Sequence, residues 1–105
     1  MSESIGLACR LIGPELAERK ALIAAELLDQ VASVVESDDG FTLRWSSGDP
    51  WAERVLEIVR LERQCCPFIR FELTIEPNDG PVTLRLLGND EVKQFIRTEL
   101  LSPAP

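Results

Sequence analysis

The chain of 105 residues contains no histidine, and its basic residues are outnumbered by acidic ones. Without imidazole, neither a Ser–His nor a Cys–His nucleophile pair can form, so acid–base chemistry falls to carboxylates, thiols, lysine or water. The formal net charge of −7 argues against general nucleic-acid binding, because that requires a basic surface that displaces counterions. We therefore expect no nucleic-acid partner.

Long hydrophobic runs are also missing. No apolar run approaches the roughly 20 residues that span a bilayer, and residues 1–4 lack the basic region of a signal peptide. We expect a cytoplasmic protein with no membrane association. The chain has three cysteines, which in that compartment are free thiols or metal ligands rather than a disulfide framework.

The hydrophobic pattern predicts one domain over residues 1–105, with frayed ends at 1–4 and 102–105. Alternation and helical spacing predict a fold of the α/β (α+β) class: a two-layer sandwich in the order β-α-β-α-β-β-α. Its mixed four-stranded sheet would have all helices on one face, and its first two strands would be parallel. The expected strands are 5–12, 41–46, 68–76 and 82–87, and the expected helices are 14–35, 50–66 and one that begins after residue 89.

The most specific feature is the adjacent pair Cys65 and Cys66, followed by Pro67 at the end of a predicted helix. Adjacent cysteines do not form an unstrained disulfide, because their Cα atoms lie about 3.8 Å apart, below the usual range of about 4.4–6.8 Å. Their two sulfurs can instead bind one soft ion, such as Zn(II), Cu(I), Hg(II) or As(III).

Two further residues could complete such a metal site. Cys9 lies on the inward face of the first predicted strand, and Glu62 precedes Cys66 by one helical turn. The alternative is structural, since free cysteine is among the most buried residue types. A thiol enzyme for sulfur transfer or redox chemistry is a third interpretation, in which Arg63 or Arg70 would stabilise a thiolate. The partial negative charge at a helix C-terminus opposes that thiolate.

The segment LERQCCPFIRFEL, residues 61–73, contains a signature of the form E-R-x-C-C-P-F-x-x-F-x-L. It resembles a family of small uncharacterised bacterial proteins, related to segments associated with MerR-like regulators of metal response. The resemblance implies a thiol-linked or metal-linked role in a bacterial cytosol. The signature positions in this chain are Glu62, Arg63, Cys65, Cys66, Pro67, Phe68 and Phe71.

A second candidate site is the open face of the sheet. The outward strand positions carry Arg10, Arg44, Arg70 and Arg85, with Glu72 among them. Such a row of guanidinium groups could bind an anion or form a homodimer through the two open faces. It could also be a solvated face with cross-strand Arg–Glu pairs.

Three functions remain open at this point. The first is a small cytoplasmic protein that binds a soft metal or metalloid ion through the cysteine pair. The second is a non-catalytic, dimeric interaction domain with structural cysteines. The third is the thiol enzyme, which the missing histidine disfavours, so the balance is against catalysis.

Overall fold

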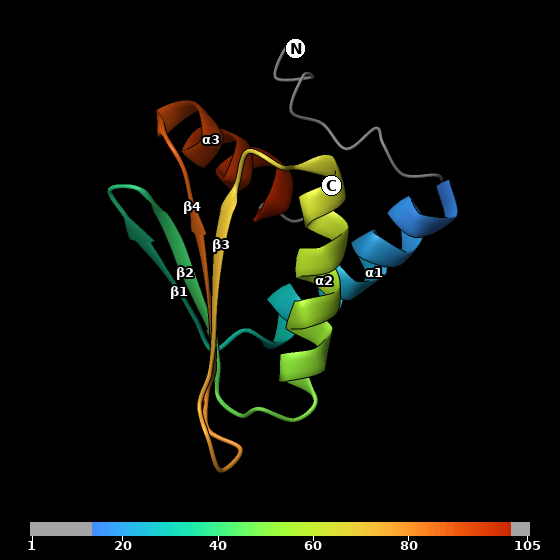
Figure 1. The fold of residues 1–105 in the computed structure, drawn as a ribbon, viewed down its shortest axis with the longest axis vertical. Coiled ribbons are helices and arrows are strands. Elements are labelled where there is room, and N and C mark those ends of the chain that lie inside the picture. Colours follow the sequence, from blue (N-terminus) through green and yellow to red (C-terminus); the bar gives the residue numbers. More distant parts are fainter. Residues whose placement is uncertain (1–13, 102–105) are drawn as a thin grey trace.

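The computed structural model describes residues 14–101, in which helices alternate along the chain with pairs of consecutive strands (Figure 1). In chain order the elements are α1 (Pro14–Gln30), β1 (Ser33–Ser37), β2 (Gly40–Trp45), α2 (Trp51–Cys65), β3 (Arg70–Ile75), β4 (Val82–Leu87), α3 (Asp90–Phe95) and the π-helical turn η2 (Ile96–Leu100). Within this range no helix is long and apolar enough to cross a membrane.

The four strands form one sheet in the order β1-β2-β4-β3, and the helices cover one of its faces (Figure 1). The predicted class, a two-layer α/β sandwich with a four-stranded sheet, is therefore confirmed. The predicted mixed sheet is wrong for the described strands, because every neighbouring pair is antiparallel. The predicted strand over residues 5–12, the source of the parallel pair, lies outside the described residues.

The first helix is shorter than predicted. It ends at Gln30 instead of continuing to residue 35, and the segment that follows is strand β1. Val34 and Val35 are β-branched and favour extended backbone. Their pairing with β2 satisfies their backbone groups, and a hydrogen bond of 2.7 Å from the Ala32 amide to the Arg44 carbonyl begins that pairing.

The core lies between the helices and one face of the sheet. Alternate residues of the two central strands point into it and are buried, and they pack with one side of α1 and α2. These core residues are Phe41, Leu43 and Trp45 of β2, Val82, Leu84 and Leu86 of β4, Ile23 and Leu27 of α1, and Val55, Ile58 and Val59 of α2. The other positions of the strands face away from the helices and form the open face.

Candidate functional site

Glu62 and Cys66 lie together at the C-terminal end of α2. Cys66 caps this helix, and its backbone amide donates a hydrogen bond of 2.6 Å to the Glu62 carbonyl. Because the two residues are four apart, their side chains lie on the same side of the helix, which here is the core side. Cys66 is 0% exposed and Glu62 only 5% exposed.

A lysine from another helix completes this arrangement. The Cys66 thiol donates to Glu62 Oε1 over 3.4 Å, and Nζ of Lys20 in α1 donates to the same oxygen over 3.3 Å. Lys20 is itself largely buried, with a side-chain exposure of 15%. In the Lys20–Glu62–Cys66 cluster, the Lys20 ammonium and the Cys66 thiol thus both donate to a buried carboxylate, which offsets the cost of burying its charge.

The Cys66 thiol is protonated near neutral pH. Burial raises the pKa of this thiol to about 12, and the charge and hydrogen bond of the Glu62 carboxylate add to the rise, while Lys20 opposes it. The thiolate, rather than the thiol, is the nucleophile in cysteine chemistry. Cys66 is therefore a poor nucleophile in this setting.

Glu62 also borders a small apolar cavity of about 50 Å³ between the helices and the sheet. Side chains that line it include Leu27, Trp45 and Leu84, and Glu62 is the charged member among the described lining residues. Metabolite pockets are several times larger, and the described lining of this space is apolar apart from Glu62, so it is not a pocket for a metabolite.

The other predicted ligands are only partly accounted for. Cys65 is the last residue of α2, but its side chain, like all of Cys9, lies outside what the structure describes. Among the described residues, no group of three or more potential metal ligands comes together. Of the predicted ligand set, the structure therefore brings together Glu62 and Cys66.

The remaining signature positions have a structural role or are exposed. The ring of Phe68 meets that of Phe95 edge to face, with centroids 5.4 Å apart, which fixes the segment after α2 against α3. Phe71 lies half-buried on the helix side of β3. Arg63 and Pro67 are exposed.

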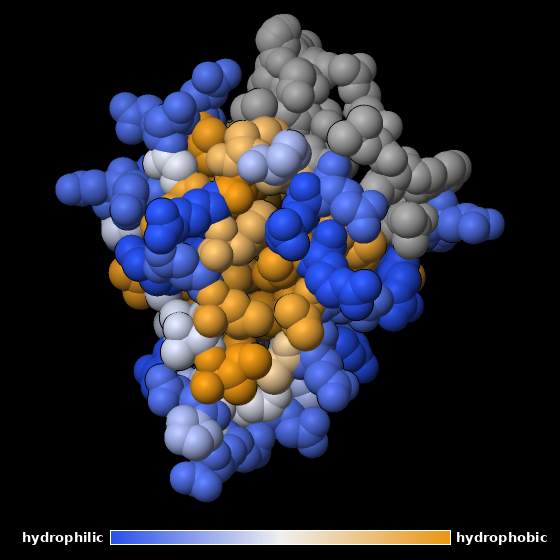
Figure 2. All heavy atoms as spheres, in the orientation of Figure 1, coloured by the Kyte–Doolittle hydropathy of each residue, from blue (hydrophilic) through white to orange (hydrophobic). Residues whose placement is uncertain are grey.

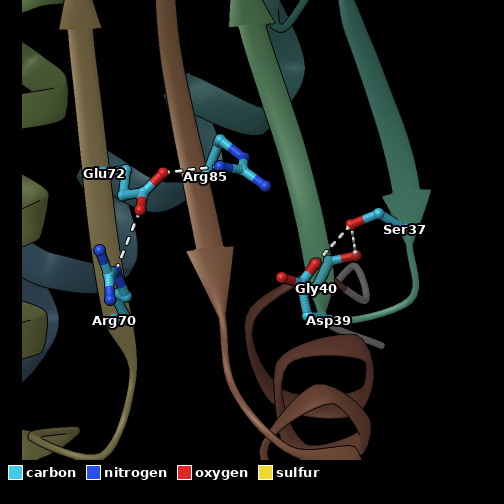
Figure 3. A network of polar contacts seen from close by, with 6 residues as sticks. All are labelled: Ser37, Asp39, Gly40, Arg70, Glu72 and Arg85. Atoms are coloured by element: carbon cyan, nitrogen blue, oxygen red, sulfur yellow. Dashed lines mark hydrogen bonds and ion pairs between the residues drawn. The ribbon is translucent and has the colours of Figure 1, made fainter.

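The predicted arginine face is present in part. Arg44, Arg70 and Arg85 lie on the open face with Glu72, whereas Arg10 lies outside the described residues. Glu72 accepts from Arg85 over 2.7 Å and from Arg70 over 3.0 Å, so two of the three guanidinium groups are paired with a carboxylate (Figure 3). Such exposed pairs contribute about 0–1 kcal/mol each. Of the interpretations given for this face, the ion pairs agree with a solvated face that carries Arg–Glu pairs.

Sequence reasoning missed Lys20. The residue lies on the apolar side of α1, three positions before Ile23 and seven before Leu27, which are both buried. A lysine within an apolar helical stripe indicates that its ammonium group pairs with a buried carboxylate, because lysine is rarely buried without a partner. That signal was available from spacing alone.

No family model matches this chain, and neither the curated proteins nor the solved structures include one similar enough to match.

Proposed function

We propose that this protein binds a soft metal or metalloid ion through Cys66 and Glu62, with the neighbouring Cys65 as a further sulfur ligand. The observation that carries the proposal is the distance of 3.4 Å between Cys66 Sγ and Glu62 Oε1. A tetrahedral metal with bonds of about 2.3 Å to sulfur and about 2.0 Å to oxygen separates those ligand atoms by about 3.5 Å. An ion could thus take the place of the thiol proton that Cys66 donates to Glu62, with little movement of either side chain.

The chemistry of the pair favours soft ions. A thiolate selects Zn(II), Cu(I), Hg(II) or As(III) over hard cations. Because the pKa of Cys66 is raised to about 12, the ion must displace a proton from this thiol. Binding should therefore release a proton and weaken as the pH falls.

The test titrates the reduced full-length protein with each of these ions and follows stoichiometry by native mass spectrometry and affinity by calorimetry. Glu62→Gln and Cys66→Ser should each weaken binding about tenfold or more, because altering even a residue that only supports a metal ligand costs about 10–100-fold in affinity. Glu57→Gln is the matched control, because Glu57 lies on the same helix but pairs with Arg19 at the surface. Cys9→Ser reports whether a third sulfur takes part.

One result would end this proposal: equal binding by the wild type and by the Cys65→Ser/Cys66→Ser double variant. A rise in affinity as the pH falls would also contradict it, since the proton of Cys66 must leave.

A second candidate is a non-catalytic interaction domain in which Cys66 is structural. The complete burial of Cys66 within the core supports it. In that case Cys66→Ala lowers the free energy of unfolding, and no variant of the pair changes metal binding. We do not propose a thiol enzyme, because activated cysteines have a lowered pKa, and the pKa of Cys66 is raised.

The proposed setting is a reducing bacterial cytoplasm, where both cysteines stay available to an ion. This setting rests on the resemblance of residues 61–73 to the bacterial signature.

A further inference from the structure

Strand β3 lies at one edge of the sheet, with β4 as its neighbour on one side among the described strands. Its helix-facing side chains are incompletely covered: Phe71 and Leu73 are half-buried and Ile75 is 52% exposed. Leu56 of α2 is 48% exposed. In Figure 2 an apolar band runs down the face where β3 and α2 lie in front. An edge strand beside an apolar band is a surface that can accept another strand.

We propose that the occupant of this edge is β3 of a second copy of this chain, paired antiparallel about a two-fold axis at Leu73. In this register Leu73 faces its own copy, and Phe71 faces Ile75 of the second copy. All three are apolar and lie on the helix side, so the pairing covers the side chains that the single chain leaves exposed.

The same register is electrostatically complementary on the open face. Arg70 faces Glu76 of the second copy, and the symmetry repeats this pair at the other end of the strand. Between them Glu72 faces Thr74, which is uncharged. Opposite charges directly across an antiparallel pair stabilise it, whereas like charges destabilise it.

Neighbouring registers lack this agreement. Centring the pair on Glu72 places Glu72 opposite its own copy, and centring on Thr74 places Glu72 opposite Glu76. Centring on Phe71 brings Pro67, which has no amide hydrogen, opposite Ile75. A shift that pairs odd with even positions places apolar residues on the polar face. The sequence of β3 therefore favours the Leu73 register.

The other edge strand fits self-pairing less well. β1 is five residues long, and its symmetric register about Val35 would place Val34 opposite Glu36. Glu36 is already held by Lys93 and Arg97 from the C-terminal helices. The surface that fits a second copy is accordingly the β3 edge.

The mass of the full-length protein, measured by sedimentation over a wide range of concentration, tests this dimer. We expect a dimer in the wild type. Arg70→Glu or Glu76→Arg alone places like charges across both symmetric pairs and should weaken association about tenfold, from about 0.2–1 kcal/mol per pair. The double variant Arg70→Glu/Glu76→Arg reverses both charges and should restore the dimer. If Arg70→Glu acted only by removing the Arg70–Glu72 pair within one chain, adding Glu76→Arg would not restore the dimer.

Arg44→Glu separates the two kinds of dimer. Arg44 lies on the open face of β2, away from the β3 edge, so edge pairing predicts an unchanged mass. A dimer through the open faces predicts weaker association for this variant.

Three outcomes overturn the proposal: a monomeric wild type at all concentrations, a dimer that Arg44→Glu disrupts, or a double variant that stays monomeric. A monomer whose β3 amides are protected from hydrogen exchange would assign this edge to a segment of the same chain. The dimer does not depend on metal binding, so Cys65→Ser/Cys66→Ser should leave the mass unchanged.

Discussion

At the scale of single residues, the two tryptophans differ in how much they contribute to the stability of the fold. Trp45 is almost completely buried in the core, and its indole nitrogen donates a hydrogen bond of 2.9 Å to the Leu27 carbonyl in α1. Trp51 begins α2 and is half-buried. The polar atom of Trp45 therefore ties the first helix to the sheet, because a buried carbonyl needs a donor.

Replacing Trp45 with phenylalanine should lower the free energy of unfolding by about 2 kcal/mol. The change removes the donor from a buried carbonyl and leaves unfilled volume beside it. Urea denaturation followed by circular dichroism measures the loss. Trp51→Phe is the matched control and should cost clearly less, so an equal loss in both variants would contradict the assigned role of Trp45.

The contact between Glu62 and Cys66 shows what residue spacing can predict. Four-residue spacing on an expected helix places these two side chains together, and the structure confirms that proximity. The complete burial of Cys66 does not follow from spacing, since it depends on how α1 and the sheet close over the end of α2. The contribution of Lys20 is tertiary in the same sense, because no local pattern shows which carboxylate it meets.

At the scale of elements, the hairpin of β1 and β2 depends on a close approach of two backbones. Ser37 pairs with Gly40 across a turn of two residues, Asp38 and Asp39. A Cβ atom at Gly40 would lie 1.9 Å from the Leu86 carbonyl oxygen of β4. Glycine is thus needed here so that β2 can pair with β4.

Gly40→Ala should destabilise the fold by about 3 kcal/mol or more, because backbone atoms of β4 would have to move. Gly48→Ala provides the comparison, since the nearest atom to its added Cβ would be a side-chain oxygen of Asp79 at 3.2 Å. Thermal unfolding of the two variants measures the difference. Similar melting temperatures for both would disprove the close approach.

The accuracy of the element predictions follows from the strength of the local pattern. Residues 82–87 alternate between apolar and polar side chains, and the strand has those bounds. Val31 and Val34 instead continue the helical spacing of α1, which led to an expected helix through residue 35. Pairing with β2 decides in favour of a strand there, and such pairing is not visible in a local pattern.

At the scale of the whole molecule, one carboxylate joins strand β1 to the helices at the C-terminal end of the described residues. Glu36 of β1 accepts from Lys93 Nζ over 2.8 Å and from Arg97 over 2.6 Å. The hydrogen bonds from Lys93 and Arg97 hold the pKa of this carboxyl below its ordinary value. Strand β1 is thereby linked to α3 and η2, which follow β4.

This link should make stability depend on pH in the acidic range. A carboxyl group whose pKa is lowered by folding stabilises the fold above its unfolded pKa, and this contribution disappears as the pH falls through the lowered value. The wild type should thus be more stable than Glu36→Gln at pH 7, and the difference should close in acid. Urea titrations across that range measure it, and a difference independent of pH would show that the ion pairs contribute nothing.

The order of the strands also has a consequence for how the protein folds. The sheet order β1-β2-β4-β3 places β4, the last of the described strands, between two earlier ones. Until residues 82–87 emerge from the ribosome, β2 and β3 have no strand to join them. The hairpin of β1 and β2 can close early because its contacts are local, whereas pairs such as Gly40 with Leu87 join distant parts of the chain. Assembly of the sheet is therefore expected to be completed only after synthesis has passed β4.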